Sequence, residues 1–118
     1  MNIQIYGTTK CFDTKKAQRY FKERNIKFQF IDLAKFGMSK GEYNSIKAAL
    51  KCNLDDLVNE KSKKYESSFI KYLATENAKE EKLLENQEMF KTPIVRNGKK
   101  ATLGYEPETW KQWEESDK

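Results

Sequence analysis

Cys11 is the residue whose type and position best suit chemistry. It follows a short apolar segment and a Gly-Thr-Thr-Lys turn, and it precedes a basic amphipathic segment that begins near Thr14. A cysteine between a strand and a helix start lies near unpaired backbone N–H groups and the positive end of the helix dipole, which both favour the thiolate. Lys10 and Lys15 act in the same direction. The pattern predicts a reactive sulfur; the alternative is a cysteine that serves only for packing.

The rest of the chain limits what can act with this sulfur. Histidine is absent, and the second cysteine is Cys52. A Cys–His nucleophile pair is therefore excluded, and two thiols alone do not complete a tetrahedral zinc site, so we expect no metal. Cys52 follows a helical stretch, which leaves two alternatives. It is either a resolving thiol that reaches Cys11 or a small residue at a junction between helices.

The composition is that of one small domain with a heavily charged surface. The chain has 118 residues, of which 37% are hydrophobic and 35% charged, and its net charge is +5. This length supports one core, and no apolar run is long enough to span a bilayer. The first residues enter a strand without a secretory leader, so we expect a cytoplasmic monomer. Basic and acidic residues are interleaved, which argues against direct nucleic-acid binding.

The N-terminal third predicts a strand, a helix and a second strand. Residues 2–6 and 27–33 have the alternation of short strands. Between them, apolar residues at helical spacing predict a helix that Asp13 or Thr14 caps and that ends at Asn25 in a left-handed conformation. Such a unit implies parallel strands with a right-handed crossover. The helix residues expected to face inward are Ala17, Tyr20 and Phe21.

The middle of the chain, residues 39–90, has almost no strand pattern. Ser39 and Glu42 have the spacing of a capping box at the start of a helix. The remaining expectations are a short helix opened by Asn53, helices at residues 67–75 and 79–87, and a solvated loop at residues 59–64.

Strand patterns return near the C-terminus. Residues 93–96 and 99–103 flank the Asn-Gly dipeptide at 97–98, which predicts a hairpin with a two-residue type I′ turn. Pro107 is placed to begin a final helix, with Trp110 and Trp113 as its apolar anchors.

The order of these elements predicts the fold class. It is α/β, with a thioredoxin-like β-α-β … β-β-α core and an all-helical insertion between the two halves. We expect a single domain, residues 1–118. Residues 1–36 and 91–118 would form the core, and residues 37–90 the insertion.

An ordered set of motifs extends over nearly the whole chain and resembles the arsenate reductase (ArsC) family and its relatives, the Spx-type regulators. The resemblance implies the thioredoxin-like fold and a reactive cysteine at Cys11. The motifs that carry it are Tyr6-Gly7, Cys11, Lys16-Ala17, Ile26, Phe30, Asp32-Leu33, Thr92-Pro93-Ile94-Val95 and Gly104-Tyr105.

The resemblance also gives Pro93 and Thr92 a place beside the sulfur. Pro93 matches the proline that is cis in thioredoxin-like folds, and a cis bond would turn the Thr92 peptide group toward Cys11. The alternative is that Pro93 only begins a strand, where proline is tolerated.

Two departures from the family patterns bear on activity. Glutaredoxin-linked arsenate reductases hold their oxyanion with three arginines, and the matching positions are Asn59, Thr92 and Tyr105, none of which is cationic. Asn59, Tyr105 and the nearby Lys91 are the candidate anion contacts. Spx-type regulators usually carry Cys-x-x-Cys, but here the fourth position is Thr14, which excludes a disulfide within the motif. Thr14 is either a hydroxyl donor to the thiolate or only a helix-start residue.

The resemblance and the residues together predict a monothiol thiol-disulfide oxidoreductase or reductase. Cys11 would attack a disulfide or an oxidised substrate, and glutathione or another small thiol would resolve the adduct. Lys10, Lys15 and Lys91 would attract an anionic thiol. We expect no bound cofactor, and glutaredoxin is a candidate partner. The alternatives are an Spx-like regulatory protein that binds RNA polymerase or another protein, and an arsenate reductase with an atypical anion site.

Overall fold

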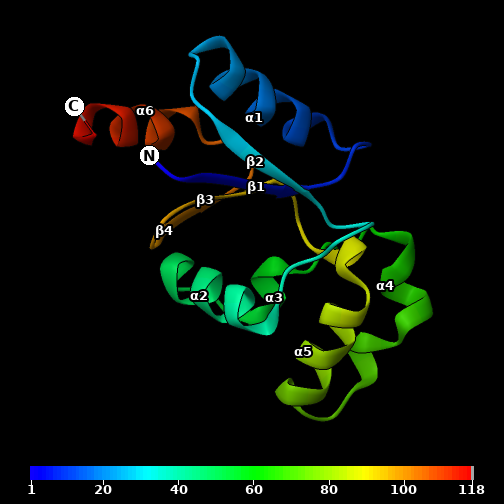
Figure 1. The fold of residues 1–118 in the computed structure, drawn as a ribbon. Helices are drawn as coiled ribbons and strands as arrows, with labels where there is room; N and C mark the ends of the chain where they lie inside the picture. The colour runs from blue at the N-terminus through cyan, green and yellow to red at the C-terminus, as the bar shows by residue number, and fades with distance from the viewer. Residues whose placement is uncertain (118) are drawn as a thin grey trace.

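A four-stranded sheet in the order β2-β1-β3-β4 forms the centre of the computed structural model (Figure 1). The model describes residues 1–117, and Lys118, the last residue of the predicted domain, lies outside the described residues. β1 and β2 are parallel, whereas β1 and β3, and β3 and β4, are antiparallel. The strands are β1 (Ile3–Gly7), β2 (Phe28–Asp32), β3 (Ile94–Asn97) and β4 (Lys100–Leu103). The predicted α/β class is confirmed.

The crossover helix α1 (Phe12–Glu23) begins earlier than the sequence predicts. Cys11 is its N-cap residue, with extended backbone angles of φ −85° and ψ 120°. The prediction that Asp13 or Thr14 caps this helix is wrong, because both lie in its first turn and Thr14 is fully buried. Asn25 follows the helix with φ of 57°, in the predicted left-handed conformation. The predicted inward residues are confirmed: Ala17, Tyr20 and Phe21 are buried.

The hairpin of β3 and β4 is present, but its turn lies one residue later than predicted. Asn97 pairs with Lys100, so the two-residue turn consists of Gly98 and Lys99. Asn97 stays in β3 because it also pairs with β1 and its Oδ1 accepts a hydrogen bond from the Asn2 backbone N–H at 3.1 Å. A type I′ turn needs positive φ at both turn positions. Gly98 has φ of 60° but Lys99 does not have a positive φ, so the predicted type is wrong.

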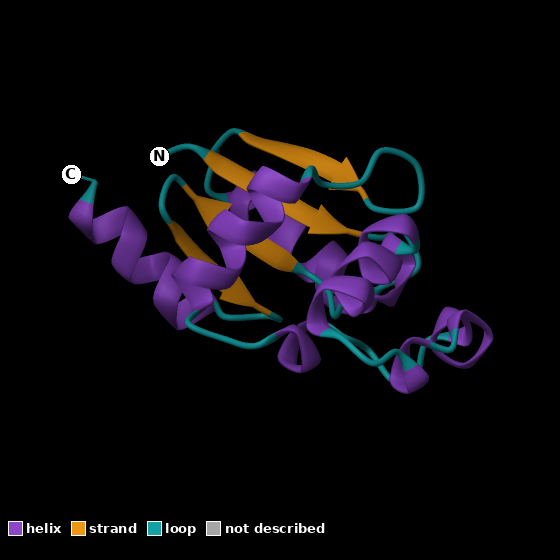
Figure 2. Ribbon diagram, turned by 90° about the horizontal axis from the view of Figure 1, so that it is seen from below, coloured by secondary structure: helices purple, strands orange, loops and turns teal. Residues whose placement is uncertain are grey.

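The two faces of the sheet bury separate hydrophobic clusters. α1 and α6 (Pro107–Ser116) cover one face, and the helical insertion lies against the other (Figures 1 and 2). Side chains of β1 alternate between them: Ile3 and Ile5 join the first cluster, and Tyr6 joins the second. Trp110 is fully buried in the first cluster and donates its Nε1–H to Thr102 Oγ1 at 2.8 Å.

The insertion begins with the predicted capping box. Ser39 Oγ accepts a hydrogen bond from the Glu42 backbone N–H at 3.1 Å, and Glu42 Oε1 accepts one from the Ser39 N–H at 3.1 Å. The elements that follow are α2 (Lys40–Leu50), α3 (Leu54–Leu57), α4 (Lys63–Ser68), the 3-10 helix η1 (Ile70–Tyr72), α5 (Glu76–Glu85) and the 3-10 helix η2 (Gln87–Met89).

Three predictions within the insertion are wrong. The helix expected at residues 67–75 is divided into α4 and η1. Phe69 adopts φ of 56°, which interrupts the series of helical backbone hydrogen bonds. The loop expected at residues 59–64 contains the start of α4, which Ser62 caps through its Oγ and the Lys64 N–H at 3.3 Å. α5 also begins before the predicted residue 79, because Thr75 caps it.

Both chain ends lie on the same side of the molecule (Figure 2). The N-terminal ammonium of Met1 pairs with Asp117 Oδ2 at 3.0 Å. Within residues 1–117, no helix has the length and apolar character needed to cross a membrane.

Candidate functional site

The loop from β1 to α1 places Cys11 at the start of the helix. The Cys11 backbone N–H donates to the Thr8 carbonyl at 3.2 Å, and its own carbonyl accepts from the Lys15 N–H at 3.2 Å. These two hydrogen bonds fix the residue as the boundary between turn and helix. The free N–H groups of the first turn therefore face the sulfur, which is partly exposed.

Thr14 lies in the first turn of α1 and is completely buried. Its Oγ1 has no hydrogen-bond partner with regular geometry among the described residues. A Cβ added to Gly7 would overlap the Oγ1 and Cγ2 atoms of Thr14. Gly7 is therefore the residue that lets the helix approach β1 closely enough to hold the Thr14 hydroxyl at the site.

Thr92 and Pro93 border the sulfur from the other half of the sheet. The Thr92–Pro93 peptide bond is cis, as the family resemblance implies. The Cys11 Sγ–H donates to the Thr92 carbonyl oxygen at 3.7 Å. The half-exposed Thr92 thus presents backbone and side chain to the sulfur, while Pro93 is buried behind it.

The surroundings of Cys11 favour its ionised form. Burial raises the pKa of the Cys11 thiol, but hydrogen bonds from the hydroxyls of Thr14 and Thr92 and from the backbone N–H groups of Thr14 and Asp13 lower it. The net pKa lies below the ordinary cysteine value. A thiolate at Cys11 also gives the buried Thr14 hydroxyl the acceptor that it otherwise lacks.

A hollow of about 630 Å³ opens in front of Cys11. A short antiparallel pairing between residues 57–59, in the middle of the insertion, and residues 89–91, before Pro93, forms one of its walls. Asn59 N–H donates to the Met89 carbonyl, and Lys91 N–H donates to the Leu57 carbonyl, both at 2.7 Å. The lining consists of Cys11, Asp55, residues 58–61, residues 91–92, Leu103 and Gly104.

The charge in this hollow is mixed. Lys61 and Lys91 supply cations, whereas Asp55 and Glu60 supply carboxylates. No arginine within residues 1–117 lines it. Such a lining suits a ligand that carries both signs of charge better than a compact polyanion.

The structure brings together some of the predicted site residues and separates others. Asn59, Lys91 and Thr92 line the hollow with Cys11. Tyr105 lies outside the hollow lining, with its ring 5.5 Å from the Trp110 ring and under the Lys16 ammonium at 5.6 Å. Lys15 extends over the exposed Phe12 ring at 5.6 Å, and Lys10 lines a second hollow, which Cys11 does not line.

Cys52 lies in the insertion, packed against the hydrophobic cluster there. Burial raises the pKa of its thiol, and the Asp56 carboxylate raises it further. It is not among the residues that line the hollow at Cys11, and both cysteines are free.

Sequence reasoning missed several residues of the hollow. Asp55, Glu60, Leu103 and Gly104 were not expected to line the site with Cys11. The signal that could have found the first two is the pairing of the chain around Val58 with Phe90, since one bridge places the whole segment beside Lys91.

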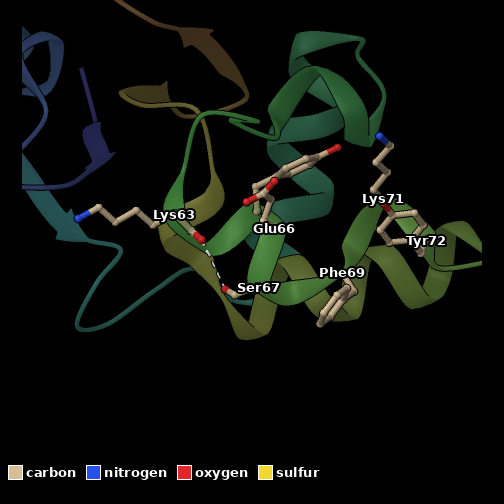
Figure 3. A pocket seen from close by; sticks show the side chains of 7 residues that line it. Lys63, Glu66, Ser67, Phe69, Lys71 and Tyr72 are labelled. Atoms are coloured by element: carbon tan, nitrogen blue, oxygen red, sulfur yellow. Dashed lines mark hydrogen bonds between the residues drawn. The ribbon is translucent and has the colours of Figure 1, made fainter.

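A separate pocket of about 530 Å³ lies on α4 and η1 in the insertion (Figure 3). Phe69 and Tyr72 border it with exposed side chains, and their ring centroids are 6.5 Å apart. This pocket contains no cysteine, so it offers a surface for contact and no nucleophile of that kind.

Comparison with known proteins gives consistent matches over nearly the full length. The sequence model of the ArsC family matches residues 6–113. The uncharacterised protein YusI of Bacillus subtilis is 24% identical over 115 residues, which cover 95% of this chain and 98% of YusI. An arsenate reductase from Vibrio cholerae superimposes with a TM-score of 0.82 at 20% identity, covering 95% of this chain and 97% of that one. SACOL0876 from Staphylococcus aureus gives 0.73 at 25% identity, covering 93% and 96%.

Proposed function

The chain belongs to the ArsC family, and from this premise we propose that it is a thiol-dependent reductase in which Cys11 is the reacting thiol. The observation that carries the proposal is the placement of Cys11 as the N-cap residue of α1, open to a hollow and surrounded by hydroxyl and N–H donors. These donors stabilise the thiolate, which is the nucleophilic form of cysteine.

The reaction proposed is a thiol–disulfide exchange on a mixed disulfide of glutathione. The Cys11 thiolate attacks the glutathione sulfur, a new S–S bond forms at Cys11, and the other sulfur leaves as a thiolate. A second glutathione thiolate then attacks the glutathione sulfur held on Cys11. Cys11 leaves as thiolate and oxidised glutathione is released, so each cycle consumes one free glutathione and releases one thiol from the mixed disulfide.

An external thiol is required because this chain has no resolving cysteine in the site. Thr14 occupies the position of the second cysteine in a Cys-x-x-Cys motif, and Cys52 is packed within the insertion. Glutathione carries two carboxylates and one ammonium group. The hollow offers Lys61 and Lys91 for the carboxylates and Asp55 or Glu60 for the ammonium.

The first test is the pH dependence of Cys11 alkylation by iodoacetamide in a Cys52→Ser background. The expected midpoint lies below the value of about 8.5 for an unperturbed cysteine. Reduction of the mixed disulfide of glutathione and 2-mercaptoethanol is then measured in a coupled assay with glutathione reductase and NADPH. An unshifted midpoint together with no turnover above the uncatalysed rate would overturn the proposal.

A protein-binding role is the second candidate, favoured by the exposed aromatic pair in Figure 3. Phe69 and Tyr72 are 64% and 75% exposed. Phe69 also holds a left-handed backbone conformation, which costs about 1–2 kcal/mol for a residue with a Cβ. An Spx-like regulator would bind purified RNA polymerase with Cys11→Ser unchanged in affinity, and would lose binding with Phe69→Ser and Tyr72→Ser. Binding that requires Cys11 would contradict it.

Arsenate reduction is the third candidate, and the residues that line the hollow at Cys11 argue against it. Its cations are lysines, which do not give the planar bidentate contacts that an oxyanion receives from arginine. We expect no turnover of arsenate with glutathione and glutaredoxin, measured as arsenite formed against a reaction without protein.

A further inference from the structure

A second hollow, of about 410 Å³, is lined in part by the loop that ends at Cys11. We call it the lysine hollow. Its walls are residues 8–10 of that loop, Ala34 after β2, residues 62–64 at the start of α4, and Glu88. The mechanism proposed for Cys11 leaves this hollow without a role.

Two segments of the chain continue from the lining of the hollow at Cys11 into the lining of the lysine hollow. Residues 59–61 face Cys11, and residues 62–64, which continue the same segment, face the lysine hollow. In the same way, Cys11 borders one hollow and residues 8–10 border the other. A bound peptide that runs along these two segments therefore has one part at the sulfur and the adjoining part in the lysine hollow.

The charge of the lysine hollow is strongly positive. Lys10, Lys63 and Lys64 line it and are all exposed, against the single carboxylate of Glu88. None of the three forms an ion pair with another residue in the range 1–117. Lys63 also lines the pocket of Figure 3, where its side chain points away from Phe69.

Two other lysines of the insertion, Lys47 and Lys82, have carboxylate partners. Lys47, for example, pairs with Glu80 at 3.1 Å and with Glu76 at 3.5 Å. The lysine hollow differs from the hollow at Cys11 in its balance of charge. It has three lysines against one carboxylate, whereas two lysines and two carboxylates line the hollow at Cys11. The hydroxyls of Thr8, Thr9 and Ser62 add donors to the walls of the lysine hollow.

We propose that the lysine hollow binds the carboxylates of an acidic peptide segment whose oxidised cysteine is presented to Cys11. This rests on the proposed reductase function and names its substrate class: a protein cysteine in mixed disulfide with a small thiol, with aspartate or glutamate a few residues away. The Cys11 thiolate attacks the sulfur of the small thiol in this mixed disulfide and forms a disulfide bond with it. The peptide cysteine leaves as thiolate. Lys63 and Lys64 set the preference for acidic sequences, and the small thiol that regenerates Cys11 is the one that the proposed function already uses.

The test compares two glutathionylated peptides that differ only in charge, with Asp and Glu flanking the cysteine in one and Asn and Gln in the other. The measured quantity is the ratio of kcat/KM for the acidic peptide to that for the neutral one. We expect roughly a threefold to tenfold preference at low salt, which is the scale of two exposed ion pairs. The preference should fall with added NaCl because exposed charges are screened.

The double variant Lys63→Gln, Lys64→Gln should bring this ratio close to one. The matched control is Lys99→Gln, Lys100→Gln, which removes the same charge at the turn between β3 and β4 and should keep the preference. A ratio of one in the unaltered protein, or a preference that the control variant loses equally, overturns the proposal.

Binding separates this proposal from the proposed function. In the Cys11→Ser variant, fluorescence anisotropy is measured with labelled acidic and neutral peptides that carry serine in place of cysteine. If neither glutathionylated peptide is reduced, the proposed function fails, but tighter binding of the acidic peptide that depends on Lys63 and Lys64 still supports the lysine hollow. Equal binding of both peptides overturns the hollow, whatever the reductase assay gives.

Discussion

Cys11 and Cys52 carry the same side chain, and the two regions of the molecule that hold them shift their pKa in opposite directions. Burial raises the pKa of both thiols. At Cys11, hydroxyl and backbone N–H donors outweigh burial and lower it. At Cys52, the Asp56 carboxylate adds to burial, and the opposing effect of Lys47 is smaller, since that lysine is paired with two glutamates.

In the reactive region, neutral hydrogen-bond donors lower the pKa of Cys11 more than basic residues do. The principal groups that lower the pKa of Cys11 are Thr14, Thr92 and the Asp13 N–H, and the nearby lysines are not among them. From the sequence, we expected Lys10 and Lys15 to favour the thiolate of Cys11. They lie instead in the lysine hollow and over Phe12, where they can attract a substrate.

Replacing each cysteine in turn should give the largest difference in reductase activity between the two regions. Cys11→Ser removes the proposed nucleophile and should lower mixed-disulfide reduction by about 10³-fold or more, on the scale of nucleophile removal in other enzymes. Cys52→Ser should keep activity within about twofold, because Cys52 is packed away from the hollow. The measurement is initial rate with glutathione as reductant. A comparable loss from Cys52→Ser would make that residue a resolving thiol.

Gly7→Ala should damage the reactive region by displacing Thr14. The new methyl group would occupy the space of the Thr14 side chain, and such overpacking costs about 1–3 kcal/mol. We expect a lower free energy of unfolding in urea and slower alkylation of Cys11 at neutral pH. Gly41→Ala in the insertion is the control, since the closest atom to its added Cβ is Ser39 Oγ at 3.9 Å. Equal stability of the two variants would contradict the packing argument.

Thr14 and Thr102 are two buried threonines whose hydroxyls differ in their hydrogen bonds. The Thr102 Oγ1 accepts a hydrogen bond from Trp110, whereas the Thr14 Oγ1 has no regular partner among the described residues. Thr14→Val removes a hydroxyl that has no regular partner, so stability should stay within about 0.5 kcal/mol or rise. Alkylation of Cys11 near neutral pH should nevertheless slow, because the thiolate loses its strongest donor. The expected signature is reduced reactivity without reduced stability.

The control, Thr102→Val, should show the reverse. It leaves the Trp110 indole N–H buried without an acceptor, which costs about 1–3 kcal/mol, and it leaves Cys11 reactivity unchanged. Urea denaturation and alkylation rates on the same samples provide both readouts. Loss of stability in Thr14→Val comparable with that in Thr102→Val would mean that the Thr14 hydroxyl has a structural partner.

Features that depend on residues close in sequence could be predicted from the sequence alone. The capping box of Ser39 and Glu42 and the N1 position of Pro107 depend on neighbours within a few residues, and both were predictable. The cis bond before Pro93 followed from the family resemblance. The division of the helix at Phe69 was not predictable, because a bulky aromatic residue gives no local signal for a left-handed conformation.

The residues of the site were harder to predict where their contacts are distant in sequence. Thr14 was expected at the start of α1, but whether it caps the helix or is buried depends on the close approach at Gly7. The positions of Asn59 and Lys91 depend on a pairing between segments about thirty residues apart. Tyr105 aligns with an arginine position of the family, yet its ring packs on Trp110, because the chain turns at Gly104 with φ of 86°.

The smallest expected effect is a difference in how the two thiols change stability with pH. Because the pKa of Cys11 is lower in the folded protein than in the unfolded chain, the folded state favours its thiolate. The contribution of Cys11 to stability is therefore fully present above the unfolded value of about 8.5 and is lost as pH falls through the folded pKa. Cys52 has the opposite sign: its contribution is present below about 8.5 and is lost as pH rises toward its raised folded pKa.

Urea denaturation at several pH values from neutral to mildly alkaline measures this difference against the serine variant of each cysteine. The free energy of unfolding of the unaltered protein should rise with pH relative to Cys11→Ser in the window below about 8.5. Relative to Cys52→Ser it should fall with pH above that value. If both differences have the same sign, the two regions do not treat their thiols differently, and the donors around Cys11 do not hold its thiolate.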